Sequence, residues 1–173
     1  MIRVRVRAVR SGFLAMRLAC LPVKRYTNKQ SVCFMGGCGD MQAQGGCQCG
    51  AVRFSVDGPV HFSAVCHCPS CRKSAGAPLV GWAMFDTAAL TVDRPAVSVH
   101  ASSPGVRRSF CGTCGTTLFF EADYMPGLVD ITTESFDNPD DVRPTDQIWT
   151  RHETACVRAL AGMPRHESLP PQA

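Results

Sequence analysis

Eleven cysteines in a chain of 173 residues are the feature of this sequence best suited to chemistry. Seven of them fall into three closely spaced groups: Cys47-x-Cys49, Cys66-x-Cys68-x-x-Cys71 and Cys111-x-x-Cys114. Thiolates at such spacing are soft ligands, which favour zinc over hard cations and tetrahedral coordination. The apolar stretch at residues 11–22 lacks the pattern of a secretory signal. We therefore expect a reducing compartment, the cytoplasm, where grouped cysteines bind metal rather than form disulfides.

The local sequence indicates how each group could present its sulfur atoms. A Cys-x-Cys pair on an extended strand puts both side chains on one face, because side chains alternate along a strand. Cys66 and Cys68 have the same parity as the apolar Ala64, so we expect one strand to carry both on its apolar face and His67 on the other. Gly115 permits a tight turn after the last pair.

Seven thiolates divide into four and three, which predicts two zinc ions per chain. A site with four protein ligands is closed and structural, whereas a site with three accepts water or a substrate atom. Two other interpretations remain open. One is a single four-cysteine zinc ribbon with three unpaired thiols, and the other is two structural sites completed by a nearby histidine. Spacing alone does not say which pair joins which.

The chain around these groups reads as a series of short strands. From Gly45 onward, turn signals recur about every eight to twelve residues, a spacing typical of all-β folds. Apolar and polar residues alternate through 52–56, which predicts the first strand. Further strands are expected at 60–66, 79–85, 89–92, 96–100, 106–110, 117–122, 128–136 and 147–152. One short helix is expected near the end, where Cys156, Ala159, Leu160 and Met163 lie at helical spacing.

Charge divides the chain unevenly. Residues 1–43 carry eight basic residues and one acid, whereas residues 44–173 carry ten basic residues and thirteen acids. We expect a basic extension at 1–43, disordered or preceding a true start at Met41, then a zinc-binding domain at 44–165 and a flexible tail at 166–173. The acidic body lacks basic stripes, so no nucleic-acid partner is expected for it. No run of 18 apolar residues occurs, so no membrane-spanning helix is expected.

Three motifs carry a resemblance to a known family. GGCQCGAVRF (45–54), CHCPSCRKSAGAP (66–78) and FCGTCGTTL (110–118) resemble, in order and spacing, the signature of the glutathione-dependent formaldehyde-activating (GFA) family, which shares its domain with centromere protein V. The resemblance covers roughly residues 44–160 and implies a mainly β, zinc-stapled domain of the Mss4-like, or β-tent, type. It also implies a structural zinc on Cys47, Cys49, Cys111 and Cys114 and a catalytic zinc on Cys66, Cys68 and Cys71.

The resemblance further implies an activity. It is that of a carbon–sulfur lyase, similar to S-(hydroxymethyl)glutathione synthase, acting on the adduct of a thiol such as glutathione with an aldehyde such as formaldehyde. A zinc ion with three thiolates and a vacancy agrees, since it could hold a substrate thiol in its reactive form. Arg72 and Lys73 are candidate substrate-binding residues that could steer a carboxylate, although a solvated turn or a backbone contact would also explain them. His67 is either a proton relay or, without a catalytic role, a surface residue or one whose hydrogen bonds are satisfied.

Two other functions remain possible. In a non-catalytic module, both zinc ions are structural and the basic arm binds an acidic partner. The two Cys-x-x-Cys motifs also occur in thiol redox proteins, but no βαβ pattern of the thioredoxin type surrounds them. The basic arm and Cys156 depart from the family pattern, and we expect Cys156 to be a buried structural thiol.

Overall fold

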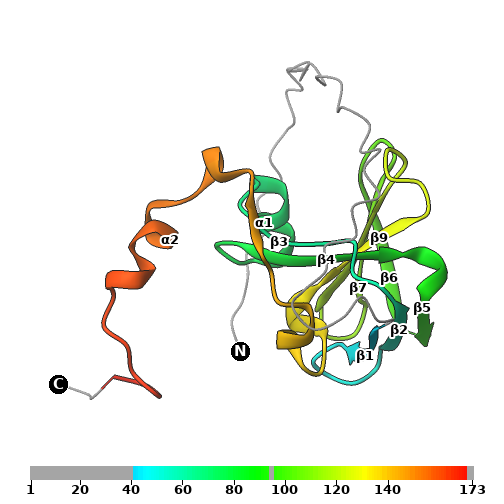
Figure 1. The fold of residues 1–173 in the computed structure, drawn as a ribbon, viewed down its shortest axis with the longest axis horizontal. Coiled ribbons are helices and arrows are strands. Elements are labelled where there is room, and N and C mark those ends of the chain that lie inside the picture. Colours follow the sequence, from blue (N-terminus) through cyan, green and yellow to red (C-terminus); the bar gives the residue numbers. More distant parts are fainter. Residues whose placement is uncertain (1–40, 94–95, 171–173) are drawn as a thin grey trace, which may run out of the picture. The chain divides into compact units, whose positions relative to one another are not determined.

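The computed structural model describes residues 41–93 and 96–170, and within them the fold is mainly β (Figure 1). The basic extension therefore lies outside the described residues except for its last three positions. A three-stranded antiparallel sheet has the order β1-β2-β5, with β1 at Met41–Gly46, β2 at Arg53–Gly58 and β5 at Leu90–Asp93. The first strand thus begins three residues before the expected domain boundary at residue 44.

The remaining described strands form a seven-stranded sheet with the order β10-β3-β4-β9-β8-β7-β6. Neighbouring strands are antiparallel except for β10, which pairs parallel with β3. The strands are β3 (Phe62–Cys66), β4 (Val80–Asp86), β6 (Val97–Ser103), β7 (Val106–Cys111), β8 (Thr117–Ala122), β9 (Leu128–Thr132) and β10 (Asp146–Ile148). Each strand of this sheet overlaps a range that the sequence predicts to be a strand.

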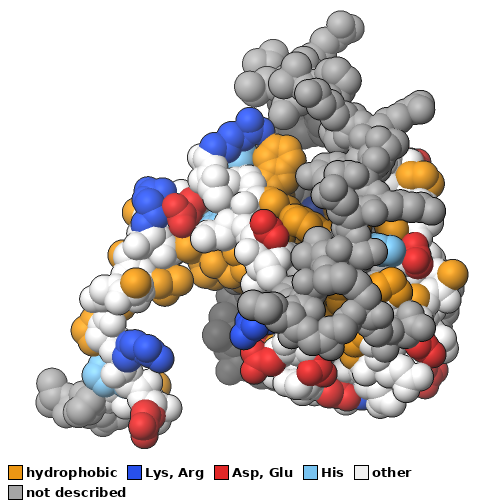
Figure 2. All heavy atoms as spheres, viewed as in Figure 1, with side chains coloured by type: hydrophobic (Ala, Val, Ile, Leu, Met, Phe, Trp, Pro, Cys, Tyr) orange, Lys and Arg blue, Asp and Glu red, His pale blue; other side chains and the backbone are white. Residues whose placement is uncertain are grey.

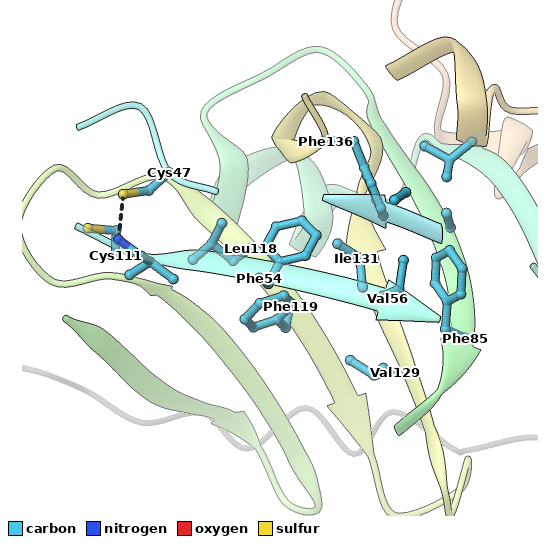
Figure 3. Packing of buried hydrophobic residues seen from close by; sticks show 14 residues of the cluster. Cys47, Phe54, Val56, Phe85, Cys111, Leu118, Phe119, Val129, Ile131 and Phe136 are labelled. Carbon is cyan, nitrogen blue, oxygen red and sulfur yellow. Dashed lines mark hydrogen bonds between the residues drawn. The ribbon is translucent and has the colours of Figure 1, made fainter. Parts of the chain in front are cut away.

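The main core contains side chains from both sheets, as Figure 3 shows. Phe54 and Val56 of β2 are buried, as expected from their alternation with polar neighbours. Phe54 meets Phe119 edge to face, with ring centroids 5.5 Å apart, and Phe136 in the same manner at 5.2 Å. Such pairs add to the free energy that burial alone provides. Phe85, Leu118, Val129 and Ile131 also belong to this core.

A glycine allows β1 to approach this core closely. A Cβ atom on Gly45 would lie 2.3 Å from Cζ of Phe54 and 2.3 Å from the backbone oxygen of Ser135. Neither contact is possible for real atoms, and the second involves backbone that cannot rotate away. The absence of a side chain at position 45 is therefore a requirement of this packing.

Two short α-helices are present among the described residues: α1 at Pro69–Ala75 and α2 at Ala155–Ala159. The second confirms the short C-terminal helix, but Cys156 is exposed, so the expectation that it is a buried thiol is wrong. No residue of α2 is buried, so this segment offers no packing that would enclose the Cys156 thiol. Single-turn 3-10 helices occupy Thr87–Ala89, Thr133–Ser135, Pro139–Val142, Thr150–His152 and Leu160–Gly162. None of the described helices has the length and apolar character needed to cross a membrane.

Two of the strands are shorter than the ranges expected from the sequence. The expected strand at 128–136 ends at Thr132 and continues as a 3-10 helix. The expected strand at 147–152 is reduced to β10, because Trp149 adopts left-handed backbone angles (φ 60°) and a helical turn follows. Acidic side chains gather near β1 and β2 on the face shown in Figure 2, in keeping with the negative balance of residues 44–173.

Candidate metal centres

The first and last cysteine pairs come together from two different sheets. The Sγ atoms of Cys47, Cys49, Cys111 and Cys114 all lie within 4.8 Å of one another. Cys47 and Cys111 lie at one end of the core in Figure 3 and are buried. The first pair follows β1, whereas Cys111 ends β7. A metal ion bound here would connect the two sheets through four sulfur atoms.

Both pairs are presented by similar turns. The amide of Gly50 donates to the carbonyl oxygen of Cys47 at 3.0 Å, and the amide of Gly115 donates to that of Cys111 at 2.8 Å. Both glycines have left-handed backbone angles, with φ of 77° and 80°, which favour glycine at these positions. The amide of Val52 donates to Sγ of Cys47 at 3.2 Å. These turns direct the sulfur atoms toward a common point.

Neighbouring hydrogen-bond donors ease the ionisation of one thiol of this group, that of Cys114. The Thr116 hydroxyl lies 3.2 Å from Sγ of Cys114, and hydrogen bonds from its side chain and its backbone lower the pKa of Cys114 to about 5. A thiolate is the form of cysteine that binds metal, so this shift suits a ligand.

The middle cysteines form a second, separate group. The Sγ atoms of Cys66, Cys68 and Cys71 lie within 4.8 Å of one another, and among the described residues no further His, Cys, Asp or Glu joins them. Cys66 ends β3, and Cys71 lies on α1 with its side chain buried. The prediction that one strand carries both Cys66 and Cys68 is wrong, because the strand ends at Cys66.

The short helix α1 sets the geometry of this group. Cys68 is its N-cap residue, and the Cys68 sulfur accepts a hydrogen bond of 3.3 Å from the amide of Cys71. Pro69 follows at a first-turn position where no amide hydrogen is needed. Gly76 ends the helix in the left-handed conformation that glycine adopts most readily. The helix thereby holds two of the three sulfur atoms.

The three sulfur atoms compete for protons. Hydrogen bonds with the thiols of Cys66 and Cys71 lower the pKa of Cys68 well below its usual range, whereas the contact with Cys68 raises the pKa of Cys66. Without a cation, therefore, one of these sulfurs ionises at the expense of its neighbours. A bound divalent ion would stabilise all three as thiolates and release protons.

Apolar side chains enclose the middle group on one side. Val80 and Trp82 of β4 are buried against Cys66 and Cys71, with Phe120 of β8 and Ile148 of β10 packed around them. Trp82 and Phe120 lie 6.0 Å apart between ring centroids. These side chains exclude water from that side, which strengthens electrostatic interactions at the sulfur atoms.

The two predicted substrate-binding residues lie on α1. The Nε atom of Arg72 donates to the backbone oxygen of His67 at 3.0 Å, which is the backbone contact that the sequence left open as an alternative. Lys73 is exposed and, with Arg72, lines a shallow depression that Pro69, Gly76 and Ala77 also border. Substrate binding by this pair stays a prediction.

His67 is fully buried. Its Nε2 atom lies 3.1 Å from Oε1 of Gln147, and its amide donates to the backbone oxygen of Ile148 at 3.0 Å. Its Nδ1 atom has no hydrogen-bond partner among the described residues. These contacts tie the end of β3 to β10 and explain the position of His67 without a catalytic role.

Arg108 of β7 lies beside the middle group and was not singled out from the sequence. It is 7% exposed, and its Nη2 atom lies 3.2 Å from Oγ of Ser70 and 3.7 Å from Sγ of Cys71. The only sequence signal was an arginine pair, Arg107–Arg108, shortly before Cys111. Which arginine faces the cysteines follows from the pairing of β7 with its neighbours, and a single sequence does not give that register.

Two groups of cysteine sulfurs on a mainly β scaffold define a class of protein with candidate thiolate metal sites. Comparison with known proteins narrows this class. The family model described as "Glutathione-dependent formaldehyde-activating enzyme" (GFA) matches residues 42–152, so the chain belongs to the GFA family. The mainly β, Mss4-like fold with cysteine clusters that this family implies is confirmed.

Individual proteins are also similar to this chain. The chain is 32% identical over 123 residues to a candidate glutathione-dependent formaldehyde-activating enzyme of Halomonas elongata, a match that covers 62% of this chain and 73% of that protein. It is 30% identical over 77 residues to an uncharacterized lyase of Schizosaccharomyces pombe, covering 44% of this chain and just over half, 56%, of that protein. A Rhodobacter sphaeroides protein of known crystal structure is 22% identical, with a TM-score of 0.48, and the match covers 60% of this chain and 98% of that one.

Proposed function

We propose that this protein is a zinc-dependent carbon–sulfur lyase of the GFA type. It would form or cleave the adduct of a thiol, by default glutathione, with an aldehyde, by default formaldehyde. The observation that carries the proposal is a group of three cysteine sulfurs beside a separate group of four. The proposal includes a cytoplasmic location, because a reducing compartment keeps thiols free.

The donor atoms fit zinc. Both groups offer sulfur alone, the spread of the sulfur atoms within each is at most 4.8 Å, and zinc–sulfur bonds are about 2.3 Å long. Cys47, Cys49, Cys111 and Cys114 would hold a structural ion, and Cys66, Cys68 and Cys71 would hold the ion of the reaction centre. When bound there, zinc would supply a Lewis acid able to acidify a substrate thiol and to polarise an aldehyde oxygen.

The reaction balances without an oxidant or a reductant. In the forward direction the thiol sulfur forms a bond to the aldehyde carbon, and one electron pair of the carbonyl bond moves onto the oxygen. The sulfur loses a proton and the oxygen gains one. Cleavage reverses each of these transfers. The site must therefore stabilise negative charge first on sulfur and then on oxygen during formation, and in the opposite order during cleavage.

The residues around the three cysteines suit this task. Helix α1 fixes Cys68 and Cys71 relative to each other, so little reorganisation is needed when a substrate enters. Val80 and Trp82 exclude water from the buried side. Cys68 is half-buried, which leaves the opposite side of the group accessible.

Replacement of Cys71 tests the proposal. We expect Cys71→Ser to lower the catalysed rate of adduct formation by at least about 100-fold, because it removes a ligand from the reaction centre and even outer residues of metal sites commonly contribute about 10- to 100-fold. The rate of exchange between formaldehyde and its glutathione adduct, measured by NMR against the uncatalysed background, provides the readout.

Cys156→Ser is the matched control, since Cys156 is exposed and lies outside both groups. It should retain the activity of the unaltered protein. If Cys71→Ser lost its metal at the middle group and still accelerated exchange of every adduct tested, the proposal would be wrong. A protein with both groups loaded and no turnover of any adduct would favour the alternative of a non-catalytic binding module.

A further inference from the structure

The buried guanidinium of Arg108 has more donors than the described protein uses. An arginine side chain offers five N–H donors. Its Nη2 atom is shared between Ser70 and Cys71, whereas Nε and Nη1 are buried and have no hydrogen-bond partner among the described residues. Buried polar groups are nearly always paired, and an unpaired one costs free energy. Three N–H groups beside the middle cysteines are therefore left for another acceptor.

The positive charge of Arg108 also lacks a carboxylate partner. Among the described residues no aspartate or glutamate forms an ion pair with it, and its other close contact is the face of Phe120, 4.8 Å from Cζ to the ring centroid. A buried charge of this kind is costly unless an anion reaches it. The sulfur that its Nη2 atom contacts, Sγ of Cys71 at 3.7 Å, itself belongs to the candidate metal centre.

The neighbouring Arg107 provides a comparison, because its charge has a partner at the surface. Arg107 precedes Arg108 on the same strand, is exposed, and pairs with Asp123 at 3.0 Å between Nη1 and Oδ1. The two side chains point to opposite faces of the sheet because successive residues of a strand alternate. Only Arg108 therefore faces the three cysteines.

A ligand can approach this part of the molecule. Ser70, which accepts a hydrogen bond from Arg108, is exposed, and both Cys68 and Phe120 are half-buried. The unpaired donors thus lie behind side chains that border solvent. A small molecule bound at the three cysteines would be close enough for its remaining polar atoms to meet the guanidinium.

We propose that Arg108 binds an anionic oxygen of the molecule held at the three-cysteine group. The inference rests on the proposed function for the identity of that molecule, a thiol or its aldehyde adduct. The oxygen can come from two sources. One is the alkoxide that forms when the sulfur bonds to the aldehyde carbon, and the other is a carboxylate that the thiol itself carries near its sulfur.

A binding measurement on the full chain tests the carboxylate source. With cobalt(II) in both cysteine groups, thiol binding at the three-cysteine group alters the sulfur-to-cobalt absorption, so affinity is measured without turnover. Mercaptoacetate and its uncharged counterpart mercaptoacetamide are the probes. We expect mercaptoacetate to bind about 10- to 100-fold more tightly, the range of a charge-assisted hydrogen bond, and Arg108→Met to abolish this preference.

A kinetic measurement tests the alkoxide source. Adduct exchange between formaldehyde and mercaptoacetamide involves no carboxylate. Loss of a donor to a developing oxyanion typically lowers kcat about 100- to 1,000-fold. We therefore expect Arg108→Met to lower kcat for this uncharged pair by a factor of this order with little change in KM if Arg108 meets the alkoxide.

Two further variants make the result interpretable. Arg107→Met is the matched control and should leave both measurements unchanged. Arg108→Lys retains the charge and should recover part of whichever effect Arg108→Met removes, which a purely structural role would not predict. Full cobalt loading of the four-cysteine group in each variant reports that the chain is folded.

Each outcome decides the question. Loss of the mercaptoacetate preference supports the carboxylate source, and loss of kcat for the uncharged pair supports the alkoxide source. If Arg108→Met changes neither measurement while the unaltered protein turns over adduct, the Arg108 inference is wrong and the proposed function stands. If mercaptoacetate binds in an Arg108-dependent manner but no adduct is turned over, the inference stands and the proposed function fails. Absence of both binding and turnover in the unaltered protein overturns both.

Discussion

At the scale of the residue, the carboxyl group of Asp130 has an unusual environment. Asp130 of β9 lies between Met84 of β4 and Phe120 of β8 in the register of the seven-stranded sheet. In antiparallel strands, directly opposed residues extend to the same face, so the carboxyl group has two largely apolar neighbours. Burial raises the pKa of Asp130 from 3.8 to about 6.

This shift predicts how stability depends on pH. Because the folded chain holds the Asp130 proton more tightly than the unfolded chain, its contribution is fully present below about pH 4 and is lost as pH rises through about 6. We expect Asp130→Asn, which cannot ionise, to be relatively more stable above pH 6, by up to about 3 kcal/mol. Urea unfolding of both proteins across pH 4–8 measures the difference, in which contributions from bound metal cancel. Parallel stability curves would contradict this account of Asp130.

At the scale of the element, a close approach between β1 and its surroundings controls how the small sheet joins the core. Gly45 has no space for a Cβ atom, because Phe54 and the backbone at Ser135 occupy it. Phe54 in turn contacts Phe119 and Phe136. A change at position 45 would therefore displace β1 or the ring that supports two aromatic contacts.

Gly45→Ala is expected to reduce the free energy of unfolding by about 1–3 kcal/mol or more, the usual cost of overpacking a core. Gly162→Ala is the control, since nothing lies within 4 Å of a Cβ atom built there, and it should alter stability by less than about 0.5 kcal/mol. Thermal unfolding monitored by circular dichroism distinguishes the two. Equal melting temperatures for the two variants would show that β1 tolerates the extra atom.

Local patterns predicted the strands better than the helix. Alternation in 52–56 reflects burial of one face of β2, which the sequence of a single strand reveals. Helix α1 was not predicted from the sequence, because its seven residues, PSCRKSA, bury only Cys71 and so have no apolar periodicity. Strand β1, MQAQGG, has few bulky apolar residues and is recognisable only through its pairing with β2.

In the candidate site, too, features set by local sequence were predictable and features set by contacts between distant elements were not. The cysteines were predictable because metal ligands are few in kind and closely spaced, and the resemblance supplied the grouping that spacing left open. The environment of Arg108 was not predictable, because it depends on the register of β7 with β8 and on contact with α1. Burial of His67 likewise depends on β10, about eighty residues later in the chain.

At the scale of the whole molecule, the four-cysteine group lies between the two sheets, which also meet through side-chain packing and through a backbone bridge between Gly45 and Phe136. Cys47 and Cys49 follow β1 of the three-stranded sheet, whereas Cys111 is the last residue of β7 in the seven-stranded sheet. Structural zinc can contribute about 10–16 kcal/mol of apparent free energy, which exceeds the stability of many small domains. The two cysteine groups should therefore differ in their importance for folding.

We expect Cys111→Ser to lower the melting temperature far more than Cys71→Ser, because only the first removes a metal ligand shared between the two sheets. A strong zinc chelator should reproduce the larger effect, and added zinc should reverse it for the unaltered protein but not for Cys111→Ser. Scanning calorimetry with and without chelator provides the comparison. Similar losses of melting temperature in both variants would mean that the three-cysteine group contributes as much to the fold as the four-cysteine group.

The separation of the ligands along the chain also bears on how the protein matures. Cys66, Cys68 and Cys71 lie within six consecutive positions, whereas Cys49 and Cys111 are 62 residues apart. Closing a short loop requires less conformational entropy than closing a long one. During synthesis, the three-cysteine group is therefore complete long before the four-cysteine group. A nascent chain short of metal would fill its three-cysteine group first, and its two sheets would be joined last.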